Sequence, residues 1–157
     1  MVTVKTILFP TDGSACSKKA LTYALSLAAD WGARLVALHV IDVQVLRAAR
    51  YAFAEVGGRA EERVRQAAEA EAQRLLQEVT DTARQAAVAF EARASTGLPF
   101  EEIVEVAKAL PADLIVIGTH GRTGLSHVLV GSVTERVVRH APCPVLTVRP
   151  DEHDFVR

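Results

Sequence analysis

Short apolar runs alternate with longer segments of helical periodicity along the whole chain, and this alternation constrains the fold more than any other feature. The runs are rich in β-branched residues, as buried strands are. They lie at Val4–Phe9, Arg34–Ile41, Val88–Ser95, Leu114–Ile117 and Pro144–Val148. The helical segments cover residues 15–30, 60–87, 99–110 and 132–141. Strands separated by helices predict right-handed crossovers in a three-layer α/β sandwich around a five-stranded parallel sheet.

Length and charge narrow the class of protein. A chain of 157 residues fits one domain, which we place at residues 1–150 with a tail at 151–157. The formal net charge of −1 gives no general attraction to nucleic acid or to an anionic membrane. No apolar stretch reaches the roughly 20 residues that span a bilayer, and the first residues lack the sections of a signal peptide. We therefore expect a cytoplasmic protein that binds neither nucleic acid nor membranes.

The spacing of cysteine and histidine argues against a metal centre. Cys16 and Cys143 form no Cys-x-x-Cys pair. His120, His127 and His140 lie in one region of the sequence, but their spacing matches no zinc motif such as His-Glu-x-x-His. We expect two free thiols and no directly bound metal.

Residues 43–59 form the segment whose pattern decides least. Its larger apolar side chains, Leu46, Tyr51 and Phe53, follow no clean period. The segment fits a short helix before a glycine hinge, a variable lid over a ligand, or part of a subunit contact. These three interpretations stay open at this point.

The stretch GTHGRTGLSHVLVGS, residues 118–132, joins the fourth predicted strand to the last helix. Its glycines let a ligand approach the backbone where side chains would block it. Ser132 is expected to open the helix with a capping box, in which its hydroxyl accepts the Glu135 N–H and Glu135 reaches back. The unpaired amides of the first turn and the positive end of the helix dipole favour an anion. The stretch therefore predicts a phosphate site, although it has neither the Walker pattern nor the dinucleotide glycine pattern.

The glycine spacing in this stretch resembles that of the ATP-binding branch of the universal stress protein family. Gly118 is followed after two residues by Gly121 and after nine more by Gly131, next to Ser132. The resemblance extends to KTILFPTDGS, LVALHVID and APCPVLTVRP, and so covers most of the chain. It implies a Rossmann-like sheet of the adenine nucleotide alpha-hydrolase type, with strand order 3-2-1-4-5. Ligands of such sheets bind at the carboxyl ends of the strands where the order reverses, here between strands one and four.

The resemblance also implies a set of residues around ATP and Mg²⁺. Asp12 would face the ribose and the phosphates, either through the hydroxyls or through a hydrated Mg²⁺, and the Val40 backbone would meet the adenine. Backbone amides near the glycines would hold the phosphates, and Arg122 would pair with them. The full predicted set is Pro10, Thr11, Asp12, Val40, Gly118, Gly121, Arg122, Gly131, Ser132 and Val133.

Each of these residues also has a purely structural interpretation. Asp12 lies in a predicted turn, where aspartate commonly bonds its own backbone. Val40 lies in a buried strand, and a helix cap explains Ser132 fully. Arg122 fits an exposed surface residue nearly as well. The functional interpretation therefore depends on the pattern as a whole.

Three functions compete. The first is a non-catalytic ATP-binding regulatory module in the stress response, which alters its dimerisation or its contact with a partner. The second is a nucleotide hydrolase or transferase on the same fold: Ser132 has no evident general base, but His120 near the phosphates leaves slow hydrolysis open. The third is a dimeric scaffold without nucleotide, a branch of the family that tends to lack the glycines. We favour the first function and expect no enzyme.

The last predicted strand, PVLTV, indicates a subunit contact. A short apolar strand at the edge of a sheet invites aggregation when it is left bare. The family pairs such edges across a two-fold axis, so the resemblance implies a homodimer through this strand. The stress signal, the downstream partner and the preference among adenine nucleotides lie beyond the sequence.

Overall fold

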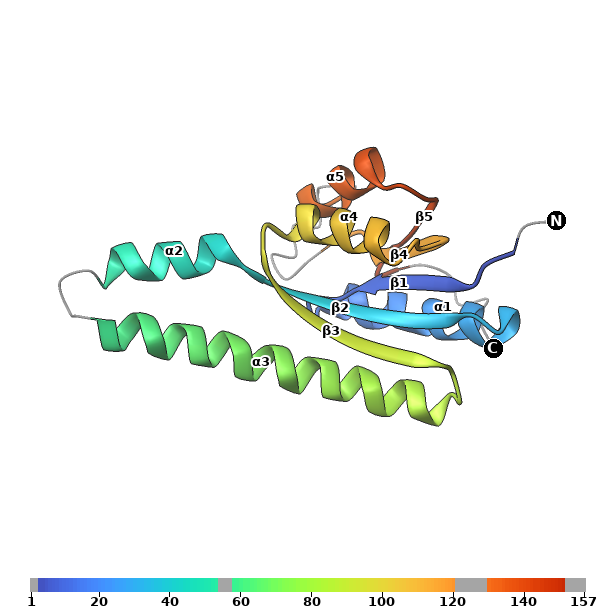
Figure 1. Ribbon diagram of the computed structural model, residues 1–157, viewed down its shortest axis with the longest axis horizontal. Helices are drawn as coiled ribbons and strands as arrows, with labels where there is room; N and C mark the ends of the chain where they lie inside the picture. Colours follow the sequence, from blue (N-terminus) through green and yellow to red (C-terminus); the bar gives the residue numbers. More distant parts are fainter. Residues whose placement is uncertain (1–2, 54–57, 121–129, 152–157) are drawn as a thin grey trace.

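A computed structural model describes residues 3–53, 58–120 and 130–151, and Figure 1 shows the arrangement. Strands and helices alternate along the chain as predicted. The strands are β1 (Thr6–Pro10), β2 (Arg34–Asp42), β3 (Phe90–Gly97), β4 (Leu114–Gly118) and β5 (Val145–Val148). The helices are α1 (Ala15–Trp31), α2 (Val43–Ala52), α3 (Gly58–Gln85), α4 (Pro99–Ala109) and α5 (Ser132–His140).

The five strands form one parallel sheet in the order β3-β2-β1-β4-β5. The α1 and α3 helices pack on one face of the sheet, and α4 and α5 pack on the other (Figure 1). This arrangement confirms the predicted three-layer sandwich and its strand order. The order reverses between β1 and β4, which makes the carboxyl ends of these strands the place to look for a site.

Apolar clusters on both faces hold the central strands. Ile7, Phe9 and Leu35 pack toward α1 and α3, whereas Leu8 and Val36 pack toward α4 and α5, because successive side chains of a strand point to opposite faces. All five side chains have 0% exposure. A strand covered on both faces must be apolar throughout, which explains why β1, β2 and β4 stand out in the sequence as continuous apolar runs.

Several predicted boundaries shift by two residues. The first strand begins at Thr6, α3 covers Gly58–Gln85 instead of 60–87, and β3 covers Phe90–Gly97 instead of 88–95. Ala92 and Ala94, which lie on the predicted alternating face of β3, are exposed because β3 is an edge strand. Element type was thus predictable, and the ends of elements less so.

Pro10 is the last residue of β1, one residue beyond the predicted run, and it ends the pairing of the strand on one side only. The Thr11 N–H donates to the Leu38 carbonyl of β2 at 2.9 Å. Neighbouring residues of a strand turn their backbone groups to opposite sides, so the nitrogen of Pro10 faces β4, where it has no hydrogen to donate. Pairing of β1 with β4 covers two residue pairs, Ile7 with Leu114 and Leu8 with Ile115. The two strands therefore part toward their carboxyl ends.

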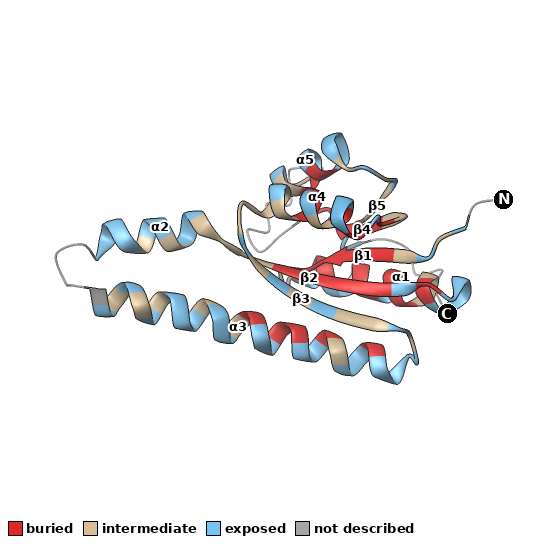
Figure 2. Cartoon of the chain, viewed as in Figure 1, coloured by how far each residue is buried: buried red, intermediate tan, exposed pale blue. Residues whose placement is uncertain are grey.

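The segment that the sequence left open begins with a helix. Residues 43–52 form α2, and Asp42 caps it by accepting the Gln44 N–H at 2.8 Å. Together with the first half of α3, α2 extends beyond the sheet as an arm (Figure 1). Figure 2 shows no buried residue in α2 and buried residues only in the later part of α3. The first buried side chain described in α3 is Ala72. None of the helices in the described part of the chain has the length and apolar character needed to cross a lipid bilayer.

Both cysteines are free, as predicted. Cys16 is buried in the first turn of α1, and Cys143 is half-buried before β5. Burial, with a smaller effect of the Asp113 carboxylate, raises the pKa of the Cys143 thiol. The thiol is therefore protonated at neutral pH and is a weak nucleophile.

Candidate functional site

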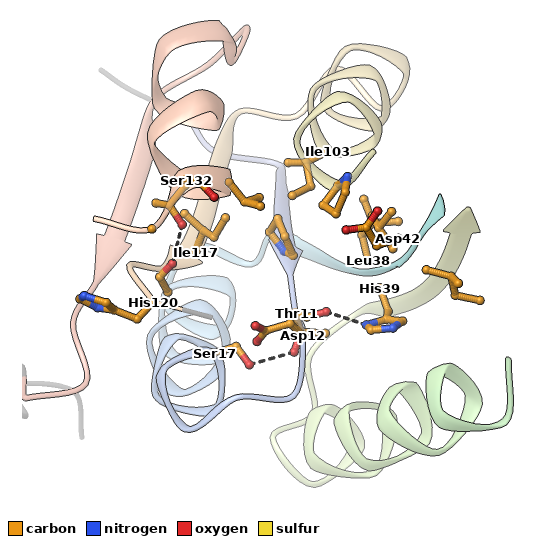
Figure 3. Close-up of a pocket in the computed structure, with 18 of the residues that line it drawn as sticks. Thr11, Asp12, Ser17, Leu38, His39, Asp42, Ile103, Ile117, His120 and Ser132 are labelled. Carbon is orange, nitrogen blue, oxygen red and sulfur yellow. Dashed lines mark hydrogen bonds between the residues drawn. The ribbon is translucent and has the colours of Figure 1, made fainter. Parts of the chain in front are cut away.

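A cavity of about 460 Å³ opens at the carboxyl ends of β1, β2 and β4 (Figure 3). Its volume lies in the range of small-molecule sites. Every predicted site residue that the structure describes lines it: Pro10, Thr11, Asp12, Val40, Gly118, Gly131, Ser132 and Val133. The remaining two, Gly121 and Arg122, lie outside the described residues. Segments that are far apart in the sequence thus meet in one crevice.

The cavity has a different character on each side of the sheet. On the α4 and α5 side Ile103 and Ile117 supply apolar surface beside Asp42 and Ser132 (Figure 3), and Val40 packs against the same apolar cluster. On the α3 side the cavity is lined by His39 and Glu71, among others. The arm contributes Val45 of α2 and Ala68 of α3, so the segment that was hard to interpret from the sequence reaches the site. The cavity therefore offers apolar surface and carboxylates next to each other.

The turn between β1 and α1 is held by short local hydrogen bonds. Asp12 Oδ1 accepts the Ser14 N–H at 3.0 Å, and Gly13 has a positive φ of 76° that favours glycine. Thr11 Oγ1 accepts the Gly13 N–H at 3.3 Å and lies 3.1 Å from Ser17 Oγ. The turn interpretation of Asp12 is therefore correct, and the same residue also lines the cavity. The turn thus places this carboxylate on the cavity wall.

Val40 presents its backbone to the cavity. The Arg34 N–H donates to the Lys5 carbonyl on the β1 side, and the Leu35 N–H donates to the Ala89 carbonyl on the β3 side. Successive residues of β2 therefore turn their backbone groups to alternate sides, so the N–H and C=O of Val40 face the β1 side. The register of β1 with β2 ends at Pro10 and Leu38, so these two groups have no hydrogen-bond partner among the described residues. They form a donor and an acceptor side by side.

The start of α5 differs from the predicted capping box. Gly131, with φ −67° and ψ 153°, is the N-cap, and no side chain caps the helix there. The Glu135 N–H donates to the Gly131 carbonyl at 2.9 Å, and the Glu135 carboxylate pairs with Arg139. Ser132 is the first residue inside the helix, so its hydroxyl does not hold the position of a cap. The capping box was wrong, but the amides of the first turn still face the cavity region, as an anion site requires.

Gly118 serves packing as well as lining the cavity. A Cβ atom at Gly118 would lie 2.9 Å from Cys16 Sγ and 3.1 Å from the Ser17 backbone nitrogen. The missing side chain therefore lets α1 approach β4, a role that the sequence did not predict. The Gly118 carbonyl accepts the Thr134 hydroxyl at 2.8 Å, which ties α5 to the end of β4.

Gly131 also lies in a close contact, in this case with the backbone just after β4. Its N–H donates to the Thr119 carbonyl at 2.6 Å, and a Cβ atom there would lie 3.0 Å from the same oxygen. A side chain at this position would push the end of β4 away from α5. The glycine thus keeps the first turn of α5 against the crevice.

A family model described as the universal stress protein family matches residues 3–149. The chain belongs to the universal stress protein family. Among curated relatives, universal stress protein MJ0531 of Methanocaldococcus jannaschii is 39% identical over 148 residues, which cover 92% of this chain and 82% of the relative. A putative universal stress protein of Staphylococcus aureus is 35% identical, with 97% of this chain and 88% of the relative covered.

Solved structures of the family share the fold. The structure of protein MJ0577 matches with a TM-score of 0.83 and 29% identity over 94% of this chain and 97% of that one. Universal stress protein UspA from Lactobacillus plantarum matches with a TM-score of 0.71 and 34% identity over 95% and 100%. A universal stress protein in complex with cAMP matches with a TM-score of 0.70 and 28% identity over 96% and 100%. These matches support the strand order and the alternation seen here.

Some residues of this universal stress protein's cavity were not among the predicted site residues. Ser17, His39 and Thr134 are buried, with 4%, 8% and 4% exposure, and each makes a hydrogen bond at the crevice. Ser17 pairs with the Thr11 hydroxyl, and His39 and Thr134 bond to backbone carbonyls far away in the sequence, none of which a motif encodes. His39 was visible as a polar residue inside an apolar strand, and that contrast is the signal that could have found it.

The charges that line the described part of the cavity are mostly acidic. Asp12, Asp42 and Glu71 bring carboxylates, and His120 lies near the glycines with its Nδ1 2.9 Å from Thr119 Oγ1. In the described ranges no three histidine, cysteine or carboxylate side chains come close enough together to hold a metal ion. A ligand with phosphates would need positive charge from the α5 terminus or from a cation that it brings along.

Proposed function

We propose that this universal stress protein binds ATP with Mg²⁺ and acts as a regulatory module of the stress response without fast catalysis. One observation carries the proposal. The N–H and C=O of Val40, which have no hydrogen-bond partner in the part of the chain that the structure describes, face the same cavity as the first turn of α5. A donor and acceptor pair for a base and a set of amides for phosphates stand at two ends of one crevice.

The Val40 end suits adenine. Adenine presents an amino donor beside a ring nitrogen acceptor, which complements a neighbouring carbonyl and N–H. Ile103 and Ile117 supply the apolar surface that a flat base needs. Hypoxanthine carries the reversed pattern, so the same edge should reject inosine triphosphate.

The α5 end suits phosphates. Ser132 and Val133 bring backbone amides in the first turn, where the helix dipole favours an anion. Asp12 lies on the cavity wall, where the ribose hydroxyls or a water of Mg²⁺ would meet it. The acidic lining favours a nucleotide that arrives with its cation, since bare phosphates would be repelled by the three carboxylates. Gly121 and Arg122 lie outside the described residues; Gly121 stays in the proposal because of the family spacing, and Arg122 because it lies in the same loop and has a fork of donors for phosphate.

A relative supports the choice of nucleotide class. The universal stress protein crystallised with cAMP is 28% identical to this chain over 96% of its length. That ligand shares its adenine and ribose with ATP. The preference for ATP over other adenine nucleotides is part of our proposal.

Calorimetry of purified, nucleotide-free protein with ATP and Mg²⁺ tests the proposal. We expect measurable heat of binding and a thermal shift, since ligand at 100 times its dissociation constant stabilises a protein by roughly 2.7 kcal/mol. Inosine triphosphate is the matched control for the base. Folded protein that gives neither heat nor a thermal shift at millimolar ATP would reject the function. Phosphate release that stays at background would support the non-catalytic form, and steady release that Gly131→Val abolishes would favour a hydrolase.

We propose, too, that the protein is a homodimer through β5. This strand lies at the edge of the sheet, and Val145, Leu146 and Thr147 are only half-buried. Pairing with a second copy would cover the edge. Sedimentation at tens of micromolar should show a dimer that Thr147→Pro dissociates, because proline removes a ladder donor. A wild-type protein that sediments only as a monomer would contradict this.

A further inference from the structure

His39 is a buried polar side chain in a mostly apolar strand. It lies in β2 beside Val40, is 8% exposed and lines the cavity. Its ring Nδ1 lies 2.8 Å from the carbonyl oxygen of Thr11 (Figure 3). A carbonyl can only accept, so Nδ1 must carry the proton and donate it. The bond therefore fixes the Nδ1 edge of the ring against the end of β1.

The Thr11 carbonyl is the acceptor that a regular ladder would give to Val40. In a parallel pair, a residue that donates its N–H to one neighbour accepts through its carbonyl from the residue two places further along. Thr11 donates to the carbonyl of Leu38, so its own carbonyl would accept the Val40 N–H as the next rung. The paired register stops at Pro10 and Leu38 instead. The imidazole of His39 occupies the place of that rung.

We propose that His39 is a positioning residue that keeps the Val40 N–H available to a ligand by occupying the Thr11 carbonyl. The side chain replaces a backbone donor, so the carbonyl stays satisfied while the amide next to it stays open. Burying a carbonyl without a partner is costly, and an open Val40 amide close to it would pair with it in the absence of the imidazole. The inference deepens the proposed function, because the open amide is the donor assigned to the base.

The same bond also anchors the turn that carries Asp12. Thr11 is held on both sides, by the Leu38 carbonyl at its N–H and by His39 at its carbonyl. Its hydroxyl takes part in the turn through the Gly13 N–H. His39 therefore couples the two parts of the crevice that would meet the base and the ribose.

Hydrogen exchange of single amides in nucleotide-free protein tests the inference without any ligand. In the wild type, the Val40 amide should exchange at least about tenfold faster than the Leu38 amide, which lies in the paired part of β2. In His39→Phe, which keeps an aromatic ring but removes the donor, the Val40 amide should form the missing rung and become about tenfold more protected. His39→Asn places an amide donor at the position of Nδ1 and should restore the wild-type exchange.

Nucleotide binding supplies the second measurement. His39→Phe should bind ATP about tenfold more weakly and lose most of its preference for ATP over inosine triphosphate, whereas His39→Asn should stay within about threefold of the wild type. A Val40 amide already protected in the wild type, or one whose exchange is the same in all three proteins, would overturn the inference. A further outcome is that the Val40 amide exchanges as expected in all three proteins while neither the wild type nor a variant binds ATP. In that case the role of His39 stands and the proposed nucleotide function is rejected. Should His39→Phe fail to fold, His39→Gln replaces it, because the glutamine amide lies one methylene too far out to bond the Thr11 carbonyl. The exchange of the Val40 amide in the wild type and in His39→Gln then tests the inference in the same way.

Discussion

The two ends of the parallel sheet use an aspartate in different ways. At the amino end, Asp113 Oδ2 accepts the N–H groups of Lys5 at 2.8 Å and Thr6 at 3.0 Å, which ties the start of β4 to the start of β1. At the carboxyl end, Asp12 Oδ1 accepts the Ser14 N–H within its own turn, and the side chain lines the cavity. One carboxylate joins two strands, and the other folds a turn beside an open crevice.

The backbone follows the same division. At the amino end the Asp113 N–H donates to the Thr6 carbonyl, so side chain and backbone bridge the same two strands. At the carboxyl end Pro10 has no N–H for β4, and Val40 faces the cavity. Polar groups near the amino end pair across the strands, whereas Asp12 and the Val40 backbone near the carboxyl end line the cavity, where the proposed function would have them meet a ligand. The following variants test how strict that division is.

The largest effect on stability should come from Gly118, a residue at the carboxyl end of the sheet that contributes to packing. Gly118 lies at the carboxyl end, yet a Cβ atom there would meet Cys16 Sγ at 2.9 Å and backbone atoms of the first turn of α1 at 3.1 Å. Because backbone atoms yield little, we expect Gly118→Ala to lower the free energy of unfolding by about 3 kcal/mol. Urea denaturation measures this loss.

A double variant separates the two kinds of clash at Gly118. Cys16→Ala removes the sulfur atom but leaves the backbone contacts, so adding it to Gly118→Ala should recover less than half of the loss. A loss below about 0.5 kcal/mol in Gly118→Ala would show that α1 can move away, and would leave Gly118 as a residue of the ligand site alone.

A smaller effect, on binding alone, is expected at Asp12. If the carboxylate meets the ribose or a water of Mg²⁺, Asp12→Ala should weaken ATP binding by about 2 kcal/mol, as for hydrogen bonds of charged groups. Its free energy of unfolding should change by no more than about 1 kcal/mol, since the turn bond to the Ser14 N–H is local. Calorimetry and urea denaturation of the same preparation measure both. Unchanged affinity would remove Asp12 from the site and leave it as a turn residue.

The opposite result, a change in stability without a change in ATP affinity, is expected at Asp113. Asp113→Ala should lower the free energy of unfolding by about 1 kcal/mol and leave ATP affinity unchanged, because the residue lies at the far end of the sheet. The partly open position of the carboxylate keeps the effect small. Lower ATP affinity in this variant would show that the two ends are coupled.

The pH dependence of Asp113 gives the same comparison a second measurement. The Lys5 N–H, and next the Thr6 N–H, lower the pKa of the Asp113 carboxyl below its ordinary value. A carboxyl with a lower pKa in the folded state stabilises the fold at pH values above its unfolded pKa of about 4, and this contribution disappears as the pH falls through the folded pKa. The difference in stability between the wild type and Asp113→Asn should therefore be constant near pH 7 and shrink below about pH 4.

The sequence predicted the layers of this fold better than its site. Periodicity is a local property, so the runs that became β1, β2 and β4 were visible without any knowledge of their neighbours. The capping box failed because Gly131 and Ser132 compete for the same cap, and the close contact of Gly131 with Thr119 decides between them. That contact joins two segments through tertiary structure and has no signature along the chain.

The site was predictable where a family pattern existed and not elsewhere. Asp12, Val40 and Gly131 line the cavity as the pattern implied. His39 and Thr134 bond to backbone carbonyls, and any hydroxyl or ring of the right reach could do so. Such bonds depend on where two strands end relative to each other, which the sequence does not state.

The smallest effect on stability is expected at a strained backbone position near the amino end of the sheet. The chain turns from α3 into β3 through Ala87, whose φ of 54° lies in the left-handed region. The Ala87 N–H donates to the Arg84 carbonyl at 3.1 Å and the Val88 N–H to the Ala83 carbonyl at 3.3 Å, a pairing that usually has glycine in the middle. Ala87→Gly should raise the free energy of unfolding by about 0.5 kcal/mol, because relief of the strain exceeds the added freedom of the unfolded chain.

The same turn at the end of α1 supplies the matched control. There Gly32 has a φ of 61°, and the Ala33 N–H donates to the Ala28 carbonyl at 2.9 Å. A Cβ atom at Gly32 would have no heavy atom within 4 Å, so Gly32→Ala tests the backbone alone and should lower the free energy of unfolding by about 1 kcal/mol. Urea denaturation of both variants gives effects of opposite sign if the left-handed turn is what matters. Equal signs would mean that packing around Ala87 outweighs its backbone strain. Neither variant should change ATP affinity, since both turns lie at the end of the sheet away from the cavity.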